Sequence, residues 1–384
     1  MKQKNNVKQI LVGILIFGFI LRLVFSILID INIFQIDIGI SKDNFNYKDK
    51  NSYDRLVEFD RNYLTYGGHL EYILTIYKTG QLPNTNINQC YHPPLSHILF
   101  AGFMKCESIF TDNNKFLIES LEFLAIIYSM LTIIVVYKIM KKIGFDENQA
   151  ILPISILTFH PLFIYLSRLV NTDGLVSLLI LISVLYLLKW YKNPSYKNVT
   201  ILAFAIGLGA MTKTSIIIMA VSLIVFYLKR LSKSIEDTKT VKNIIIQGLL
   251  FTVITLPMVF WYQFRNYYKF NQNLFGIVEA LDTLKVANNS FKARWILNNE
   301  LFNEVYEMNA SNVWANLIIS TINFSMESKA IPFLLSMVLR GLSLLLIILS
   351  IISIFKYTVK SENKDLLLIL ITIYITWIAR IYLF

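Results

Sequence analysis

Apolar side chains along this chain gather in long runs that short polar stretches interrupt. The first run, residues 10–29, is apolar except for Arg22, and at about 1.5 Å per residue it is long enough to cross the ~30 Å hydrocarbon core of a membrane. Eight further runs follow, at residues 121–137, 150–166, 175–188, 199–211, 215–228, 244–262, 333–355 and 366–384. The pattern predicts an all-α, multi-pass membrane protein with about nine spans, several of them short for a full crossing.

Two helices of another kind are predicted between the first two spans. Residues 53–77 carry apolar side chains at helical spacing, and the pattern stops at Gly80 and Pro83. The tyrosines of this segment suit a short interfacial helix on the membrane surface. Residues 95–104 are apolar but only about half a span long, which favours a re-entrant or interfacial helix.

Composition and charge agree with this class and orient the spans. Of the 384 residues, 55% are hydrophobic and 16% are charged, which is more apolar material than a soluble core of this length can hide. The net charge of +11 comes from basic residues in alternate loops. The positive-inside rule places those loops in the cytoplasm, provided that residues 95–104 do not cross. Since the basic residues are dispersed and form no single stripe, nucleic acid is excluded as a partner.

The remaining loops then face outside, and they carry the candidate chemistry. Asp37 is a carboxylate at the outer surface that could serve as a base, and Asn171 with Asp173 supplies a second acidic point between two apolar runs. Lys213 lies at a hairpin tip, and Arg265 follows the seventh span. Both cations suit phosphate oxygens, so the four side chains suggest attack on a phosphate-activated group delivered by a lipid.

Each of these residues has a structural alternative. Asp43, Asp54 and Asp60 are other acidic residues in the first outer loop that could act as the base. Asp173 could cap the helix that follows it. Lys213 and Arg265 could be snorkelling anchors, although the positive-inside bias disfavours cations on that side.

Several motifs, in their order and spacing, resemble the membrane glycosyltransferases of the C-type fold, in the branch of protein O-mannosyltransferases and aminoarabinose transferases. The likeness runs from residue 10 to about residue 330 and predicts a single membrane-embedded domain over 1–384, with outer loops 30–120 and 263–332 as insertions. It rests on Asp37, Gly68 to Ile73, Gly80 to Pro83, Tyr91 to Leu95, Asn171 to Asp173, Gly207 to Lys213, and Arg265 with Asn266.

The resemblance implies a hexosyltransferase, acting with inversion, in the cell membrane. It would move a sugar from a polyprenyl-phosphate donor to a protein, lipid or glycan acceptor on the outer face. It implies that Asp37 activates the acceptor, that Lys213 and Arg265 bind the lipid phosphate, and that Asp173 with Asn171 organises the site or a divalent metal. No cofactor is certain. His69, His92 and Asn266 complete the implied substrate-binding set.

The chain departs from the family pattern in two places. Ile36 stands where a histidine is expected before the acidic residue, and the sequence ends at Phe384 inside its last apolar run. A short form, a truncated form and an inactive transferase-derived scaffold are therefore alternatives. A membrane transporter or lipid flippase is the rival class, but the charges lie at outer tips rather than at the midplane, and no repeated halves are visible.

Overall fold

The computed structural model describes residues 2–28, 68–84 and 90–271, and this part of the chain contains helices and no strand. Almost all of the described residues belong to one compact unit, residues 1–159 with 163–276. Asp37, the alternative bases Asp43, Asp54 and Asp60, and the apolar runs 333–355 and 366–384 lie outside the described residues.

The seven other apolar runs are helical. They correspond to α1 (Lys2–Leu28), α6 (Leu121–Ile143), α7 (Glu147–Phe159) with α8 (Pro161–Leu166), α9 (Asp173–Lys192), α10 (Tyr196–Ala210), the 3-10 helix η3 (Thr214–Ile218) with α11 (Met219–Ser232), and α12 (Thr238–Phe270). Five helical segments of the described chain are long and apolar enough to span a membrane: 6–28, 114–143, 173–192, 214–232 and 238–270. The protein is thus a multi-pass membrane protein, while the number nine stays a prediction.

Short polar signals set the helix ends. The Asp237 carboxylate accepts hydrogen bonds from the backbone N–H groups of Lys239 and Thr240 at the start of α12. Glycines end two helices, because Gly80 (φ 66°) and Gly144 (φ 109°) adopt the left-handed conformation that other residues disfavour. The predicted stop at Gly80 is confirmed by α3 (His69–Thr79).

The helix α3 packs against other helices of the protein. Its side chains from His69 to Thr75 are buried, and it packs against α4 (Leu95–Glu107). Tyr72 is fully buried, so this tyrosine packs within the protein, while the position of α3 at the membrane surface stays a prediction. The 13-residue α4 is about 20 Å long, shorter than a membrane crossing, as its half-span sequence indicated.

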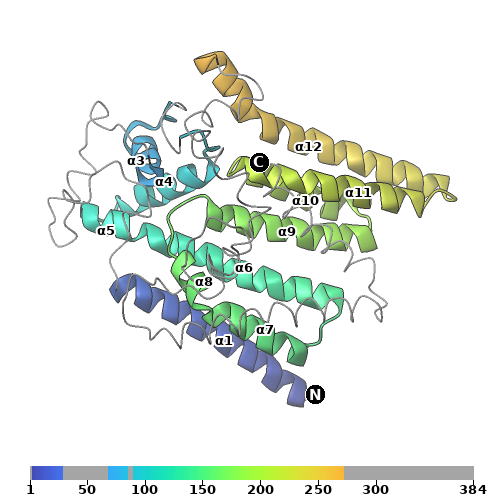
Figure 1. Ribbon diagram of the computed structural model, residues 1–384, viewed down its shortest axis with the longest axis horizontal. Coiled ribbons are helices and arrows are strands. Elements are labelled where there is room, and N and C mark those ends of the chain that lie inside the picture. Colours follow the sequence, from blue (N-terminus) through green and yellow to red (C-terminus); the bar gives the residue numbers. More distant parts are fainter. Residues whose placement is uncertain (1, 29–67, 85–89, 272–384) are drawn as a thin grey trace, which may run out of the picture. The chain divides into compact units, whose positions relative to one another are not determined.

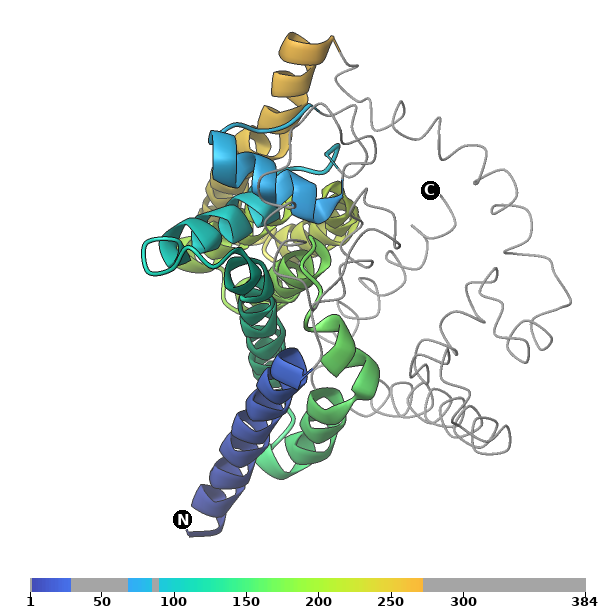
Figure 2. The same ribbon diagram turned by 90° about the vertical axis from the view of Figure 1, so that its left-hand side faces the viewer.

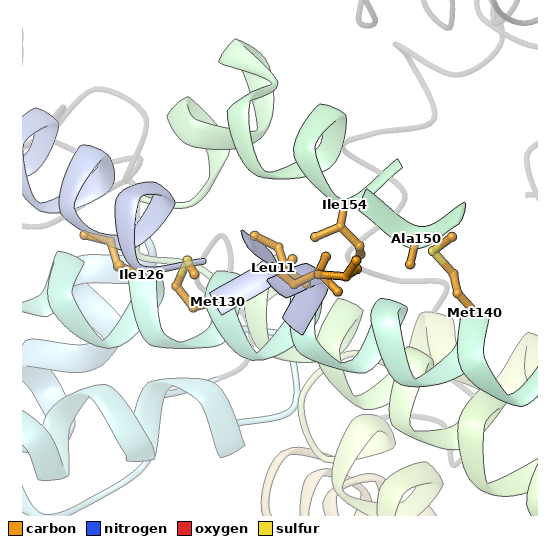
Figure 3. Close-up of a cluster of buried hydrophobic side chains, with 8 residues drawn as sticks. Leu11, Ile126, Met130, Met140, Ala150 and Ile154 are labelled. Carbon is orange, nitrogen blue, oxygen red and sulfur yellow. The ribbon is translucent and has the colours of Figure 1, made fainter. Parts of the chain in front are cut away.

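Helices α1, α6 and α7 share one apolar cluster (Figure 3). Leu11 of α1, Ile126 and Met130 of α6, and Ile154 of α7 are buried there against one another. Figures 1 and 2 both show α1 beside α7. Each of the three helices buries part of its apolar surface in this cluster.

Helix α10 lies between α9 and α12 (Figure 1). A Cβ atom added to Gly207 would lie 2.5 Å from Sδ of Met258, so the α10 backbone approaches α12 closely at this point. Two hydrogen bonds also join these helices. Trp190 Nε1 of α9 donates to Gln247 Oε1 of α12 at 2.7 Å, and Thr255 Oγ1 of α12 donates to Ala203 O of α10 at 3.3 Å. The α9–α10–α12 layer is therefore tightly fitted, and it holds the segments that follow α8 and α10.

Candidate functional site

The start of α9 presents Asp173 to solvent. The segment Ser167–Thr172, here called the α9 tip, turns tightly after α8, and Asp173 is the first residue of the helix. The Asp173 backbone N–H donates to Oδ1 of Asn171 at 2.9 Å. The alternative that Asp173 caps α9 is wrong, because Thr172 occupies the cap position and Asn171 accepts the orphan N–H. The Asp173 carboxylate is left for another partner.

That partner is Lys213. Helix α10 ends at Ala210, and Lys213 follows in extended conformation immediately before η3. Its Nζ lies 2.5 Å from Oδ1 of Asp173, although the two residues are 40 positions apart in the chain. The side chains are 25% and 59% exposed, respectively. The predicted acidic point and the predicted phosphate-binding cation thus form one solvent-accessible ion pair.

A third segment joins this pair. Residues Tyr91–Pro94 lead into α4, whose first residue, Leu95, donates its backbone N–H to Met211 O at 2.9 Å. The next residue, Ser96, is fully buried and donates Oγ–H to Asn171 O at 3.0 Å. The start of α4 is therefore tied both to the α9 tip and to the segment that carries Lys213.

Three histidines cluster at the start of α4. His69 Nδ1 and His97 Nε2 share a hydrogen bond of 3.0 Å, and the His69 ring stacks on both His92 and His97. Burial, the Lys213 ammonium and His69 lower the pKa of His92 to about 3, against the opposing effect of Asp173. Burial, followed by the other two histidines, lowers the pKa of His97 well below its usual range. His92 and His97 are consequently neutral at physiological pH.

Two tyrosines extend this cluster towards Arg265. Tyr72 stacks on His97 with ring centroids 4.0 Å apart, and its hydroxyl lies 3.4 Å from that of Tyr262. Tyr262 in turn donates to Cys90 O at 2.9 Å. Burial and the neighbouring Tyr262 raise the pKa of Tyr72, which keeps its hydroxyl neutral. A continuous buried set of rings thus runs from His92 to α12.

The Arg265 guanidinium makes hydrogen bonds to other groups of the chain. Its Nη2 donates to Leu82 O and Pro83 O, each at 3.3 Å, and its Nη1 donates to Asn266 Oδ1 at 2.9 Å. Its guanidinium also lies over the rings of Tyr262 and Phe270. A phosphate at Arg265 would have to share the guanidinium with the two backbone carbonyls, which distinguishes this cation from Lys213.

The structure therefore brings together Asp173, Asn171, Lys213, His92 and His69, and it links Arg265 and Asn266 to them through the tyrosines. The sequence pattern did not predict His97, Tyr72, Tyr262 or Ser96 as site residues. The one available signal was the spacing of His92 and His97 across two prolines. Within the described part of the chain, no three His, Cys, Asp or Glu side chains are arranged to hold a metal ion, so the divalent metal stays an expectation.

The family model for dolichyl-phosphate-mannose-protein mannosyltransferase matches residues 91–261. The chain resembles the protein mannosyltransferases. The mannosyltransferase match begins at Tyr91 and contains His92, Asn171, Asp173 and Lys213, so it spans the segments that meet at the ion pair. No curated protein matches the chain.

Proposed function

We propose that this protein transfers a sugar from a polyprenyl-phosphate donor to a hydroxyl acceptor on the outer face of the cell membrane, with inversion. The observation that carries the proposal is the Lys213–Asp173 ion pair beside neutral His92, inside the segment that matches the mannosyltransferase family. Because His92 is neutral, Lys213 carries the positive charge of this group of residues. In this proposal the phosphate therefore binds to the Lys213 ammonium.

The chemistry assigns each group a task. In an inverting transfer the acceptor oxygen bonds to C1 of the sugar, its proton passes to a base, and the bond from C1 to the phosphate oxygen breaks. Asp37 is the base in this proposal. The departing lipid phosphate gains negative charge, and Lys213 stabilises it through a charge-assisted hydrogen bond. Asp173 and Asn171 hold Lys213 in place before the donor arrives.

The other proposed site residues lie around the ion pair. His69 and His92 stack on one another near Lys213, and His92 presents a neutral ring. Arg265 binds the carbonyls of Leu82 and Pro83, and Asn266 accepts a hydrogen bond from the Arg265 guanidinium. In this proposal the guanidinium also binds a phosphate oxygen. The acceptor is a protein, lipid or glycan hydroxyl.

The direct test is transfer of radiolabelled sugar from polyprenyl-phosphate donors by the purified protein in nanodiscs. Lys213→Met should weaken donor binding and transfer by roughly ten- to hundredfold, since hydrogen bonds to charged groups contribute about 1.5–3 kcal/mol. Lys213→Arg should retain part of the activity because the charge persists. Lys242→Met, at an exposed lysine of α12, is the matched control and should leave transfer unchanged.

The base is tested separately. A general base contributes roughly 10²- to 10⁴-fold, so Asp37→Asn should lower turnover by that factor while donor binding stays intact. Asp112→Asn removes an exposed carboxylate outside the site and serves as the control. Normal turnover in Asp37→Asn, with loss in Asp43→Asn or Asp60→Asn, would move the base to another residue. Donor movement across the bilayer without any transfer would favour a flippase.

A further inference from the structure

A buried ion pair lies at the base of the α9 tip. Arg168 Nε donates to Glu122 Oε2 at 2.8 Å, and Arg168 Nη2 donates to Glu122 Oε1 at 2.9 Å. The two side chains are only 8% and 3% exposed. Ser26 of α1 donates a further hydrogen bond to Glu122 Oε2 at 2.7 Å. One carboxylate of α6 thus binds both α1 and the α9 tip.

We propose that the Arg168–Glu122 pair positions Asp173 against Lys213, so that both residues are positioning residues for the reaction. This inference rests on the glycosyltransferase proposal only for its consequence on turnover. The geometric part concerns where the α9 tip lies and stands on contacts alone.

The Arg168–Glu122 pair is a buried ion pair with two hydrogen bonds. Breaking a buried ion pair leaves a desolvated charge, yet replacing a whole pair by apolar residues is often neutral or stabilising. Stability therefore gives no reason for Arg168 and Glu122 to be there. A planar guanidinium that binds both carboxylate oxygens fixes direction as well as distance, which a lysine ammonium cannot do. What such a pair supplies is a defined geometry for the segment that carries the arginine.

That segment leads directly to the site. From Arg168 the chain turns through Leu169, whose carbonyl accepts the Asn171 N–H at 3.1 Å. Asn171 is held by Ser96 at its carbonyl and by the Asp173 N–H at its side chain. The α9 tip is therefore held at both ends: Glu122 of α6 binds Arg168, and Ser96 of α4 binds Asn171. Asp173 lies two residues after Asn171.

The expected consequence is a change in geometry with little change in charge. A misplacement of about 1 Å can cost roughly 10²-fold in rate. Arg168→Lys keeps the positive charge and loses the two-pronged bond, so it should let the α9 tip shift. The Lys213–Asp173 distance should then be less well defined, and turnover should fall by about ten- to hundredfold.

The first experiment needs no enzymatic activity. Cysteines at positions 173 and 213, introduced as Asp173→Cys and Lys213→Cys with Cys106→Ser, are joined by a short bifunctional thiosulfonate reagent in the full-length protein. The rate of cross-linking should fall several-fold when Arg168→Lys is added, and less with Ser26→Ala. Lys115→Gln breaks an exposed pair with Glu119 and is the matched control, for which the rate should not change.

The second experiment asks whether Arg168 acts through Asp173. Arg168→Lys alone should lower kcat more than it changes affinity for polyprenyl phosphate. In an Asp173→Asn background it should have little further effect, because the group that it positions is gone. The charge swap of Arg168→Glu with Glu122→Arg should recover part of the loss. A purely structural role would instead lower the folded fraction and leave kcat per folded molecule unchanged.

The outcomes separate the two proposals. Unchanged cross-linking in a folded Arg168→Lys protein overturns the positioning role, whatever the activity. If Arg168→Lys does not fold, Ser26→Ala and Ser96→Ala, which each remove one hydrogen bond, replace it in both experiments, and unchanged rates in both overturn the proposal. Slower cross-linking with no sugar transfer by the wild-type protein supports the positioning role and refutes the glycosyltransferase proposal.

Discussion

Two ion pairs border the start of α9, and they differ in nearly every physical respect. The Arg168–Glu122 pair is buried and bound through two parallel hydrogen bonds. The Lys213–Asp173 pair, five residues further along the same segment, has one contact and lies open to solvent. One pair joins α6 to the tip, and the other joins α9 to the segment after α10.

The difference separates a fixed contact from an exchangeable one. A solvent-exposed ion pair contributes about 0–1 kcal/mol, so an incoming anion can replace Asp173 at the Lys213 ammonium at small cost. Replacing Glu122 at Arg168 would leave a buried charge without its partner. The buried pair therefore defines where the site is, whereas the exposed pair is suited to change when a phosphate binds.

The largest contrast should appear in stability. Glu122→Leu leaves the Arg168 guanidinium buried without its carboxylate, which should lower the free energy of unfolding by about 3–5 kcal/mol. The double variant Arg168→Met with Glu122→Leu should recover most of that loss. Unfolding in mixed detergent micelles, monitored by circular dichroism, measures both. A Glu122→Leu loss no larger than that of Asp173→Asn would erase the distinction between the two pairs.

The next effect depends on pH and involves His92, which lies beside the exposed pair. The pKa of His92 is lowered in the folded protein from 6.5 to about 3. Between these pH values the imidazole is protonated in the unfolded chain and neutral in the folded one. Stability is therefore full above about pH 6.5 and declines as the pH falls from there towards 3, by up to about 1.4 kcal/mol per pH unit. His97 contributes with the same sign.

The measurement is the melting temperature at a series of pH values. His92→Asn should flatten the decline on the acid side. Lys213→Met should also reduce it, because removing the ammonium raises the pKa of His92 towards its ordinary value. An identical acid-side decline in wild type and His92→Asn would show that His92 accepts a proton in the folded protein as readily as in the unfolded one.

A smaller effect concerns anion binding at the exposed pair. Asp173→Asn removes the counter-charge of Lys213, so the affinity for polyprenyl phosphate should rise by up to about fivefold, corresponding to an exposed pair of about 1 kcal/mol. Stability should change by less than about 1 kcal/mol. Titration by isothermal calorimetry in nanodiscs gives the affinity. Weaker binding in Asp173→Asn would mean that the carboxylate helps the phosphate more by orienting Lys213 than it hinders it by competing for the ammonium.

The smallest effect is the response to salt. The coupling energy between Lys213 and Asp173 should nearly vanish at 1 M salt, where the screening length is about 3 Å, whereas the coupling between Arg168 and Glu122 should persist. Double-mutant cycles on stability at low and high salt compare the two directly. Equal salt dependence of both couplings would indicate that the two pairs have similar access to water.

The helices were largely predictable because each depends on a local pattern. The seven apolar runs within the described chain are all helical, and the stop at Gly80 follows from a residue that tolerates positive φ. The burial of α3 was not predicted, because tyrosines suit a membrane surface and a buried cluster equally, and its position at the membrane surface stays a prediction. Burial of Tyr72 depends on α4 and α12, which lie elsewhere in the sequence.

The site was predictable as a set of residues but not as a set of contacts. Asp173 and Lys213 were candidate site residues because placing a charge between two membrane-spanning runs costs free energy, so such residues usually have a function. Their pairing, 40 residues apart, depends on how α9 and α10 pack. Arg168 lies in the same polar break between apolar runs as Asp173, whereas Glu122 lies in the first turn of α6, where an acidic residue is common at a helix start. Only the packing of α6 against the α9 tip shows that the two are partners.

The hydrogen bond from the Leu95 N–H to Met211 O makes this amide a probe of the site. The first N–H groups of a helix have no partner within the helix, and their hydrogens ordinarily exchange quickly with water. At α4 the first of them is bound to the carbonyl two residues before Lys213. Deuterium uptake at this one amide therefore records whether the lysine segment stays docked on α4, and it should slow when a phosphate ligand fastens that segment in place.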